Sequence, residues 1–180
     1  MARTGRQEYR VEGLGEPISH YTDAVRFGDV LYVSGVAPTD AQQRVVGGDD
    51  VAAQARQIFV NLEKILKSAG AGFEDVLKVT VYMTDVEERR LINPVRQEYF
   101  GSARPASTLI GVTSLAIPGM KVEIEAVVGL PRRPARRAAA KKRASAPARK
   151  AAEAPAKKAA VKSRKRAAKP APAKRKAARR

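Results

Sequence analysis

The sequence contains few residues of the types that commonly act as nucleophiles or metal ligands, and this limits the reactions that the protein could catalyse. The chain contains no cysteine and one histidine, His20, which excludes disulfides and thiolate catalysis and argues against a metal site. Ser107 lies outside any Gly-x-Ser-x-Gly context, and no base is evident beside it, so a nucleophilic serine is not supported. The other candidates gather mainly in the stretch 76–106 and directly after it, and the chemistry is expected there.

This stretch opens with a strand pattern. Over residues 76–83 an aliphatic set alternates with a mixed one, as expected where one face of a sheet packs on a core. The aliphatic set is Leu77, Val79, Val81 and Met83. The chain then turns, and two capping boxes are open for the next helix: Thr84 with Glu87, or Asp85 with Glu88.

A helix carrying the amide side chain of Asn93 is predicted after this turn. Its apolar positions recur at helical spacing, at Leu91, Ile92, Val95, Tyr99 and Phe100. Pro94 interrupts the pattern and predicts either a kink or a fresh helical start. Gly101 ends the helix, and a loop leads to an apolar strand over residues 107–112.

Three shorter strand patterns come earlier in the chain. Residues 7–11 read as an edge strand, and residues 24–27 and 30–34 read as a hairpin that turns at Gly28 and Asp29. Each run is short and bounded by turn-forming residues, which is typical of strands in a small mixed domain.

The most regular element is a helix that follows this hairpin. Its apolar stripe is Val51, Ala55, Ile58, Phe59, Leu62, Ile65, Leu66 and Ala69. Either Asp49 or Asp50 can cap its first turn, and Gly70 and Gly72 stop it. A last strand over residues 121–128 alternates, with one face made of Val122, Ile124, Ala126 and Val128.

The order β, ββ, α, β, α, ββ predicts a compact α+β domain over residues 1–131. We expect a mixed sheet of about six strands with two helices on one face. Five Tyr, four Phe and no Trp leave a small aliphatic core, so such a domain would gain stability from oligomerisation.

The positive charge of the chain is confined to its last segment. Residues 132–180 hold 21 Lys and Arg and one acidic residue, a net charge of +20, while residues 1–131 hold 14 and 17, a net charge of −3. The segment is built from Ala, Lys, Arg and Pro, resembles the tails of linker histones, and cannot bury enough apolar surface to fold alone. We expect a disordered basic tail.

This tail is expected to bind DNA or RNA non-specifically, because dense positive charge releases counterions from phosphates and no aromatic residue is present to read bases. Its densest cationic positions are Lys141, Lys142, Arg143, Lys157, Lys158, Arg164, Lys165, Arg166, Lys174, Arg175 and Lys176. Acidic proteins and lipid headgroups are the alternative partners. Because no signal sequence or membrane-spanning run is present, we expect a cytoplasmic protein, associated with a nucleoid if the tail binds DNA.

Several stretches together resemble the Rid family, the reactive-intermediate (enamine/imine) deaminases also called the YjgF or endoribonuclease type. The similar segments are DVAAQARQIFVNLEKILKSAGAGFEDVLKVTVYMTD, INPVRQEYF, RPAST and MKVEIEAVV, within residues 17–130. The resemblance implies a chorismate-mutase-like fold and a homotrimer with a small-molecule cleft at each subunit interface. It also implies hydrolysis of 2-imino acids or enamines to 2-oxo acids and ammonia, without a metal or organic cofactor.

Four residues match positions of the family's cleft. Tyr21, Ser34 and Asn93 correspond to its tyrosine, serine and helix asparagine, and Glu123 to the glutamate that positions the hydrolytic water. From the residues alone, each also has an ordinary structural interpretation, since Asn before Pro often starts a turn and an exposed strand glutamate is common.

The family's carboxylate-binding arginine has no counterpart at its own position. Deaminating members have arginine two residues after a conserved proline, where this chain has Ser107. Losing a charged partner in a cleft costs about 2–5 kcal/mol, so 2-imino acids are expected to react less well. Arg104, three residues earlier, could replace the arginine from the loop. Two functions therefore remain open: an imine or enamine hydrolase, or a non-catalytic ligand-binding scaffold tethered to nucleic acid by its tail.

Overall fold

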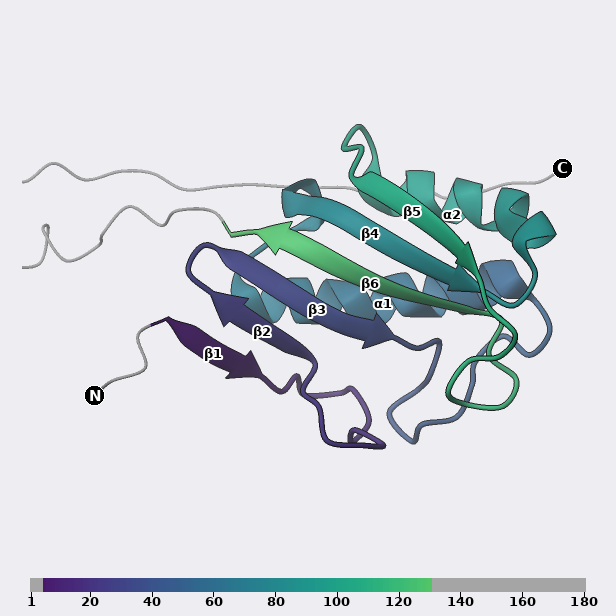
Figure 1. Ribbon diagram of the computed structural model, residues 1–180, viewed down its shortest axis with the longest axis horizontal. Coiled ribbons are helices and arrows are strands. Elements are labelled where there is room, and N and C mark those ends of the chain that lie inside the picture. The colour runs from purple at the N-terminus through teal and green to yellow at the C-terminus, as the bar shows by residue number, and fades with distance from the viewer. Residues whose placement is uncertain (1–4, 131–180) are drawn as a thin grey trace, which may run out of the picture. The chain divides into compact units, whose positions relative to one another are not determined.

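The computed structural model describes residues 5–130 and shows one six-stranded sheet with two helices on one face (Figure 1). The strands are β1 (Arg6–Tyr9), β2 (Ala24–Phe27), β3 (Val30–Val36), β4 (Val76–Met83), β5 (Ala106–Gly111) and β6 (Val122–Gly129). The helices are α1 (Val51–Ala69) and α2 (Arg89–Phe100), with single 3-10 turns at Phe73–Asp75 and Val86–Glu88. The sheet order is β1-β2-β3-β6-β4-β5, antiparallel except for β4 and β5. The predicted α+β architecture is confirmed.

Helix α1 forms as predicted, and the structure selects its cap. The Asp50 carboxylate accepts hydrogen bonds from the backbone amides of Ala52 and Ala53 at 2.8 and 3.1 Å, satisfying two first-turn donors. Gly70 ends the helix in the left-handed region, with φ at +73°, where a side chain would be strained.

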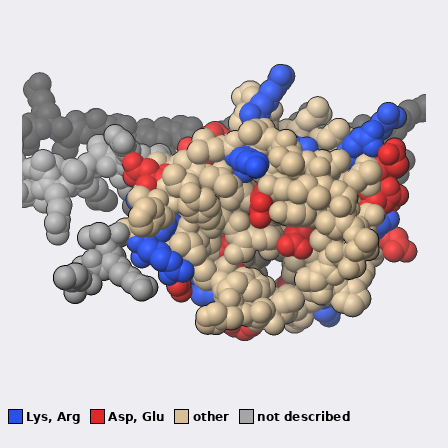
Figure 2. Space-filling view, viewed as in Figure 1, with Lys and Arg blue, Asp and Glu red and all other residues tan. Residues whose placement is uncertain are grey.

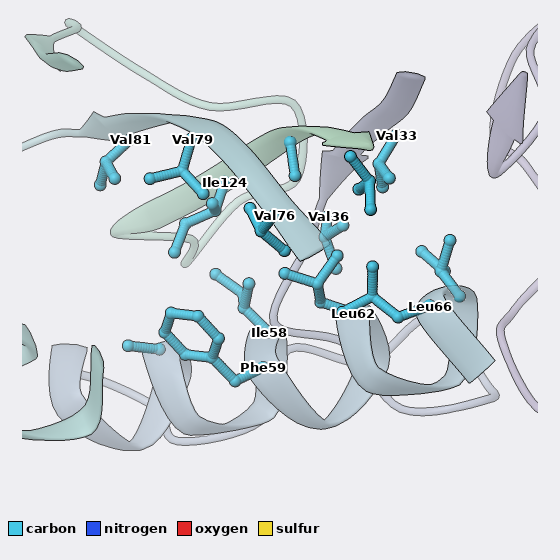
Figure 3. Packing of buried hydrophobic residues seen from close by; sticks show 14 of the residues in the cluster. Val33, Val36, Ile58, Phe59, Leu62, Leu66, Val76, Val79, Val81 and Ile124 are labelled. Atoms are coloured by element: carbon cyan, nitrogen blue, oxygen red, sulfur yellow. The ribbon is translucent and has the colours of Figure 1, made fainter. Parts of the chain in front are cut away.

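The core lies between α1 and the helix-covered face of the sheet (Figure 3). In β6 the four residues of the predicted face are buried, whereas the residues between them are partly exposed. Leu62 and Phe59 of α1 are fully buried beneath these strands. Burial of each such side chain stabilises the fold by about 1.5–3 kcal/mol.

Strand β4 departs from the predicted alternation at its first residues. A register shift lies between Val76 and Lys78, consistent with a β-bulge. As a result Val76 is buried and Leu77 is exposed, the reverse of the prediction. Val79, Val81 and Met83 are buried as predicted, although Thr80, between the first two, is buried as well. An extra residue in one strand moves the side chains before it to the other face, which a strict period of two cannot anticipate.

The turn before α2 also differs in detail from the prediction. Asp85 caps it by accepting from the Glu87 amide at 2.9 Å, so Thr84 is not the cap. Pro94 lies inside a helix that runs unbroken from Arg89 to Phe100 and does not begin it. The loose start is instead the separate 3-10 turn at Val86–Glu88.

Strand β5 forms the far edge of the sheet, and every residue in it is exposed. The strand itself is confirmed, but its apolar residues are not core residues of this chain: Leu109 and Ile110 are each 39% exposed. An exposed edge offers unpaired backbone groups and apolar side chains to another chain.

Pairing across the sheet fixes which residues share a face. Tyr82 pairs with Glu123 of β6 and with Ile110 of β5, so these three side chains lie on the open face, away from the helices. Ser107 pairs with the buried Val79 and therefore lies on the helix-covered side. None of the helices in residues 5–130 has the length and apolar content needed to cross a bilayer.

Candidate functional site

A cavity of about 400 Å³ opens where the loop after β1 meets β3 and β6. It brings together three of the predicted site residues, Tyr21, Ser34 and Glu123, with further lining from Ile18, Ser19, Gly35, Ala37, Gln43, Ala116, Ile117 and Met120. The open face of the sheet is mostly uncharged in Figure 2, with acidic side chains near a hollow at its centre. The cavity walls are therefore mostly apolar, with a few hydroxyl and amide groups, and Glu123 supplies the one carboxylate in the lining.

Glu123 enters this cavity because the neighbouring residue on β3 is glycine. A Cβ at Gly35 would lie 2.9 Å from the Glu123 Cδ and would collide with its Oε1. The pairing of β3 with β6 shifts register between Val33 and Val36, so the glycine lies in the irregular part of this strand pair. Close backbone approach thus leaves room for the carboxylate.

The surroundings of Glu123 suit a proton acceptor. Burial, with a smaller contribution from the like charge of Glu125, raises the pKa of the Glu123 carboxyl above its ordinary value. Within residues 5–130 no hydrogen bond or ion pair reaches this carboxylate. A carboxylate with a raised pKa and free lone pairs can bind a water and accept its proton.

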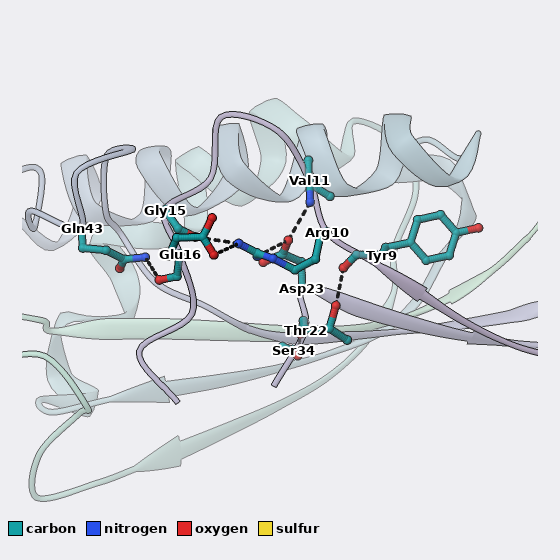
Figure 4. Close-up of polar contacts among 9 residues, drawn as sticks. All are labelled: Tyr9, Arg10, Val11, Gly15, Glu16, Thr22, Asp23, Ser34 and Gln43. Atoms are coloured by element: carbon teal, nitrogen blue, oxygen red, sulfur yellow. Dashed lines mark hydrogen bonds and ion pairs between the residues drawn. The ribbon is translucent and has the colours of Figure 1, made fainter. Parts of the chain in front are cut away.

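Ser34 holds the loop that carries Tyr21. Its hydroxyl donates to the carbonyl of Thr22 at 2.6 Å, and the Thr22 hydroxyl donates to the carbonyl of Tyr9 at 2.6 Å (Figure 4). The donor of Ser34 is therefore already used, and the residue acts on the site mainly by fixing its neighbours. Tyr21 itself is 47% exposed, so its ring is accessible at the cavity mouth.

A buried carboxylate anchors the same loop to β1. Asp23 accepts from the Arg10 guanidinium at 2.6 Å and from the Val11 amide at 2.7 Å (Figure 4). Arg10 also contacts Glu16, whose carbonyl accepts from Gln43 at 2.8 Å. This network, which the sequence did not indicate, sets the position of the loop around the cavity.

Gln54 fixes the opposite wall. It is fully buried in α1, and its amide donates to the carbonyls of Gly48 and Gly119 while accepting from the Lys121 amide, at 2.6 to 2.8 Å. The loop that it holds supplies Met120 to the cavity. A polar residue inside the apolar stripe of α1 is the signal that could have revealed this role.

The remaining predicted residues lie in a second hollow, of about 530 Å³, between α2 and the loop into β5. Asn93 and Arg104 line it, together with Arg96, Gln97, Phe100, Gly101, Ala103 and Pro105. Ser107 lies nearby, where its hydroxyl accepts a hydrogen bond from the Arg96 guanidinium at 3.0 Å. Burial lowers the pKa of Arg96. Sequence reasoning did not single out this arginine.

The predicted site residues thus fall into two groups within one chain. Glu123 lies on the open face of the sheet, whereas Ser107 lies on the helix-covered side at the edge. Residues on opposite faces of one sheet cannot line the same cleft. In residues 5–130 no cluster of three or more His, Cys, Asp or Glu residues has a geometry suited to a metal ion.

Comparisons with known proteins agree with this fold. Residues 14–130 match the family model described as endoribonuclease L-PSP. The chain is 34% identical over 116 residues to the 3-aminoacrylate deaminase RutC of Acinetobacter baylyi, covering 64% of this chain and 91% of that protein. It is 31% identical over 113 residues to a 2-iminobutanoate/2-iminopropanoate deaminase of Dermatophagoides farinae, covering 63% and 88%. Among solved structures, RidA from Psychrobacter has a TM-score of 0.65 at 29% identity, covering 69% of this chain and 99% of that one.

Proposed function

Because the chain belongs to the endoribonuclease L-PSP family, also called the Rid family, we propose that it hydrolyses a small imine or enamine to an oxo compound and ammonia. The single observation that carries this proposal is the Glu123 carboxylate, which faces an apolar cavity with its pKa raised. Two similar proteins are named as deaminases of 3-aminoacrylate and of 2-iminobutanoate, which are an enamine and an imine.

The reaction needs one base and one water. Glu123 accepts a proton from the water as its oxygen bonds to the carbon of the C=N group. The Glu123 carboxyl returns that proton to the nitrogen, which gives the neutral carbinolamine. Glu123 then moves the proton of the carbinolamine hydroxyl to the same nitrogen, so that the C–N bond breaks, the C=O bond forms and neutral ammonia leaves. An enamine reacts after it has tautomerised to the imine. The carboxylate is restored, so no cofactor is consumed. Burial of Glu123 in this cavity keeps the pKa of the base raised.

A site made between copies of the chain would unite the two groups of residues. The open face carries exposed apolar side chains, with Phe27 at 61% and Tyr32 and Leu77 each at 55%, and the β5 edge is unpaired. Exposed apolar patches and open edges mark contacts between proteins. We propose a homotrimer in which the β5 edge of one copy, with Ser107, approaches the Glu123 cavity of the next. Light scattering of the purified chain would then give three times the 19.4 kDa monomer mass.

One observation favours a second function. Ser107 occupies the position that the resemblance assigns to a carboxylate-binding arginine, and its hydroxyl is already engaged with Arg96. If this loss removes turnover, the same cavity would serve a non-catalytic ligand-binding protein. If the loss instead removes only the turnover of substrates that carry a carboxylate, substrates without one would be the only ones hydrolysed.

The basic segment adds a nucleic-acid function to this proposal. Residues 132–180 lie outside the described residues, so the proposal rests on their charge of +20 in the sequence. Such a segment binds phosphates without reading bases. Three copies on one trimer would raise the affinity by roughly 10²–10⁴ through avidity, provided that all three reach the same molecule.

The test is release of ammonia and oxo acid from a freshly generated 2-imino acid and from an enamine, against a blank without enzyme. We expect turnover by the full chain and a loss of about 10²–10⁴-fold in Glu123→Gln. Glu125→Gln, measured at a pH above the acid limb of the rate, is the matched control, because it removes an adjacent carboxylate on the same face and leaves Glu123 ionised at that pH. Equal rates in Glu123→Gln and the wild type would overturn the role of Glu123. No turnover of either substrate would favour the ligand-binding function.

A further inference from the structure

The hollow between α2 and β5 has an unusual balance of charge. Its lining includes two guanidinium groups, Arg96 and Arg104, and two side-chain amides, Asn93 and Gln97, but no acidic residue. The nearest acid along α2, Glu98, has both carboxylate oxygens 2.7 Å from a nitrogen of Arg56 and is already neutralised. The hollow is therefore cationic, although residues 1–131 have a negative net charge.

Arg96 is the organised cation of this hollow. It is partly buried, and burial lowers its pKa because the charged form loses hydration. Its one hydrogen bond within residues 5–130 goes to the Ser107 hydroxyl, and no carboxylate there pairs with it. A guanidinium has five N–H donors, so most of them remain available in a fixed orientation. A partly buried guanidinium that no carboxylate neutralises is a suitable partner for an anion that enters the hollow from solution.

We propose that this hollow binds the carboxylate of a small organic acid, with Arg96 as the anchoring group. The Ser107 hydroxyl accepts a hydrogen bond from one side of the Arg96 guanidinium. Two other N–H groups of this planar guanidinium would donate to the two oxygens of the bound carboxylate. Arg104, which is exposed and makes no ion pair within the described residues, supplies a second cation from the loop. Arg96 thus provides, from the helix, the charge that residue 107 lacks.

The position of the hollow along α2 favours a carboxylate over a phosphate. The residues of α2 that line it lie between Asn93 and Phe100, and the lining continues through Gly101 into the loop after the C-terminus of the helix. The helix dipole is negative at that end and opposes a dianion more strongly than a monoanion. No helix N-terminus, with its free amides, lines the hollow to offset this effect.

This inference rests on the proposed function only for the identity of the ligand as a substrate or product. In the trimer proposed above, a molecule held here by its carboxylate would present its C=N group to Glu123 of a neighbouring copy. Binding of the carboxylate can be measured without turnover, so the two proposals can fail separately.

The test is a titration of the full chain with 2-oxobutanoate, followed through the backbone amide NMR signals of Gly101, Ala103 and Ser107. These signals report on the hollow and not on the basic segment, which is the same in every variant. We expect saturable shifts with 2-oxobutanoate and much weaker binding of the neutral 2-oxobutanamide. In Arg96→Gln the Kd should rise at least about 30-fold. Arg96→Lys keeps the charge but loses the two parallel N–H donors of the guanidinium, so its Kd should lie between those of the wild type and Arg96→Gln.

Arg90→Gln is the matched control, since it removes one exposed arginine from the same helix outside the hollow. It should leave the Kd unchanged within about twofold. The proposal is overturned if Arg96→Gln binds 2-oxobutanoate like the wild type, if the amide binds equally well, or if inorganic phosphate binds more tightly at the same signals. Carboxylate binding through Arg96 without any turnover would leave this site standing and refute the deaminase function instead.

Discussion

The carboxylate of Glu123 occupies the space that a side chain at Gly35 would fill. The two residues lie on adjacent strands, β6 and β3, and a Cβ on the glycine would overlap the Glu123 Oε1. The position of Glu123, the proposed base, therefore depends on glycine at residue 35. This relationship can be tested without altering the glutamate.

Gly35→Ala is expected to reduce kcat/KM about 10²-fold, because the added methyl group pushes the carboxylate out of position. The free energy of unfolding should change by less than about 1 kcal/mol, since the atoms displaced are the end of a flexible side chain. Gly129→Ala is the control, because its Cβ would meet only the exposed Leu77 side chain, at 3.3 Å. Full activity in Gly35→Ala would show that the Glu123 position is not critical. Both activity and chemical denaturation should be measured.

The activity should depend on pH through Glu123. Only the ionised carboxylate accepts a proton, so the rate falls as the pH drops through the pKa of Glu123, which is raised chiefly by burial and then by Glu125. Glu125→Gln removes the like charge, lowers the pKa of Glu123 and moves the acid limb of kcat/KM to lower pH. An acid limb that stays in place would contradict this coupling.

The same raised pKa has a consequence for stability. Ionised Glu123 is less favourable in the folded than in the unfolded chain. The free energy of unfolding therefore decreases as the pH rises from the ordinary glutamate pKa to the raised pKa of Glu123 in the folded chain. Glu123→Gln removes this effect and should be more stable than the wild type at neutral pH, while losing activity. Chemical denaturation at neutral pH and at a pH below the ordinary glutamate pKa compares the two states. If the difference in free energy of unfolding between Glu123→Gln and the wild type is the same at both pH values, the raised pKa of Glu123 does not affect stability.

Gln54→Leu should destabilise the domain by about 2 kcal/mol, because it removes the hydrogen-bond partner of two carbonyls and one amide that are partly shielded from water. Any folded protein should also show a raised KM, since the loop released carries Met120 in the cavity wall. Gln57→Leu, one turn along α1, is the control and should cost about 1 kcal/mol at most, because Asn61 still donates to the Thr39 carbonyl. Equal losses in the two variants would refute the role of Gln54.

The basic segment should account for all nucleic-acid binding. A chain ending at residue 131 is expected to keep its deaminase rate per site and to lose salt-dependent binding to duplex DNA of random sequence. Neutralising Lys141, Lys142 and Arg143 together in the full chain should lower the slope of log K against log salt by up to about 0.9 per charge removed. Retention of DNA by the shortened chain would place the binding surface on the domain.

Local patterns in the sequence were sufficient to predict the elements. The stripe of α1 and the alternation of β6 specified helix and strand, because each period reflects which side chains one face can bury. Residues in adjacent turns carry that signal without any long-range contact. The resemblance to a family then gave the fold and named Glu123, Tyr21 and Ser34, which the structure places around one cavity.

Only the tertiary structure decided how the site is assembled. The bulge in β4, the overlap of Gly35 with Glu123 and the separation of Ser107 from Glu123 depend on strand register, which joins residues far apart in the chain. Arg96 illustrates the limit most clearly. On the helix it is an ordinary polar position, and it becomes a partly buried cation only where α2 packs beside the edge strand and meets Ser107. Arg96 and Ser107 are 11 residues apart in the sequence, but their hydrogen bond and the burial of Arg96 depend on how α2 packs beside the edge strand, which no periodic pattern in that window specifies.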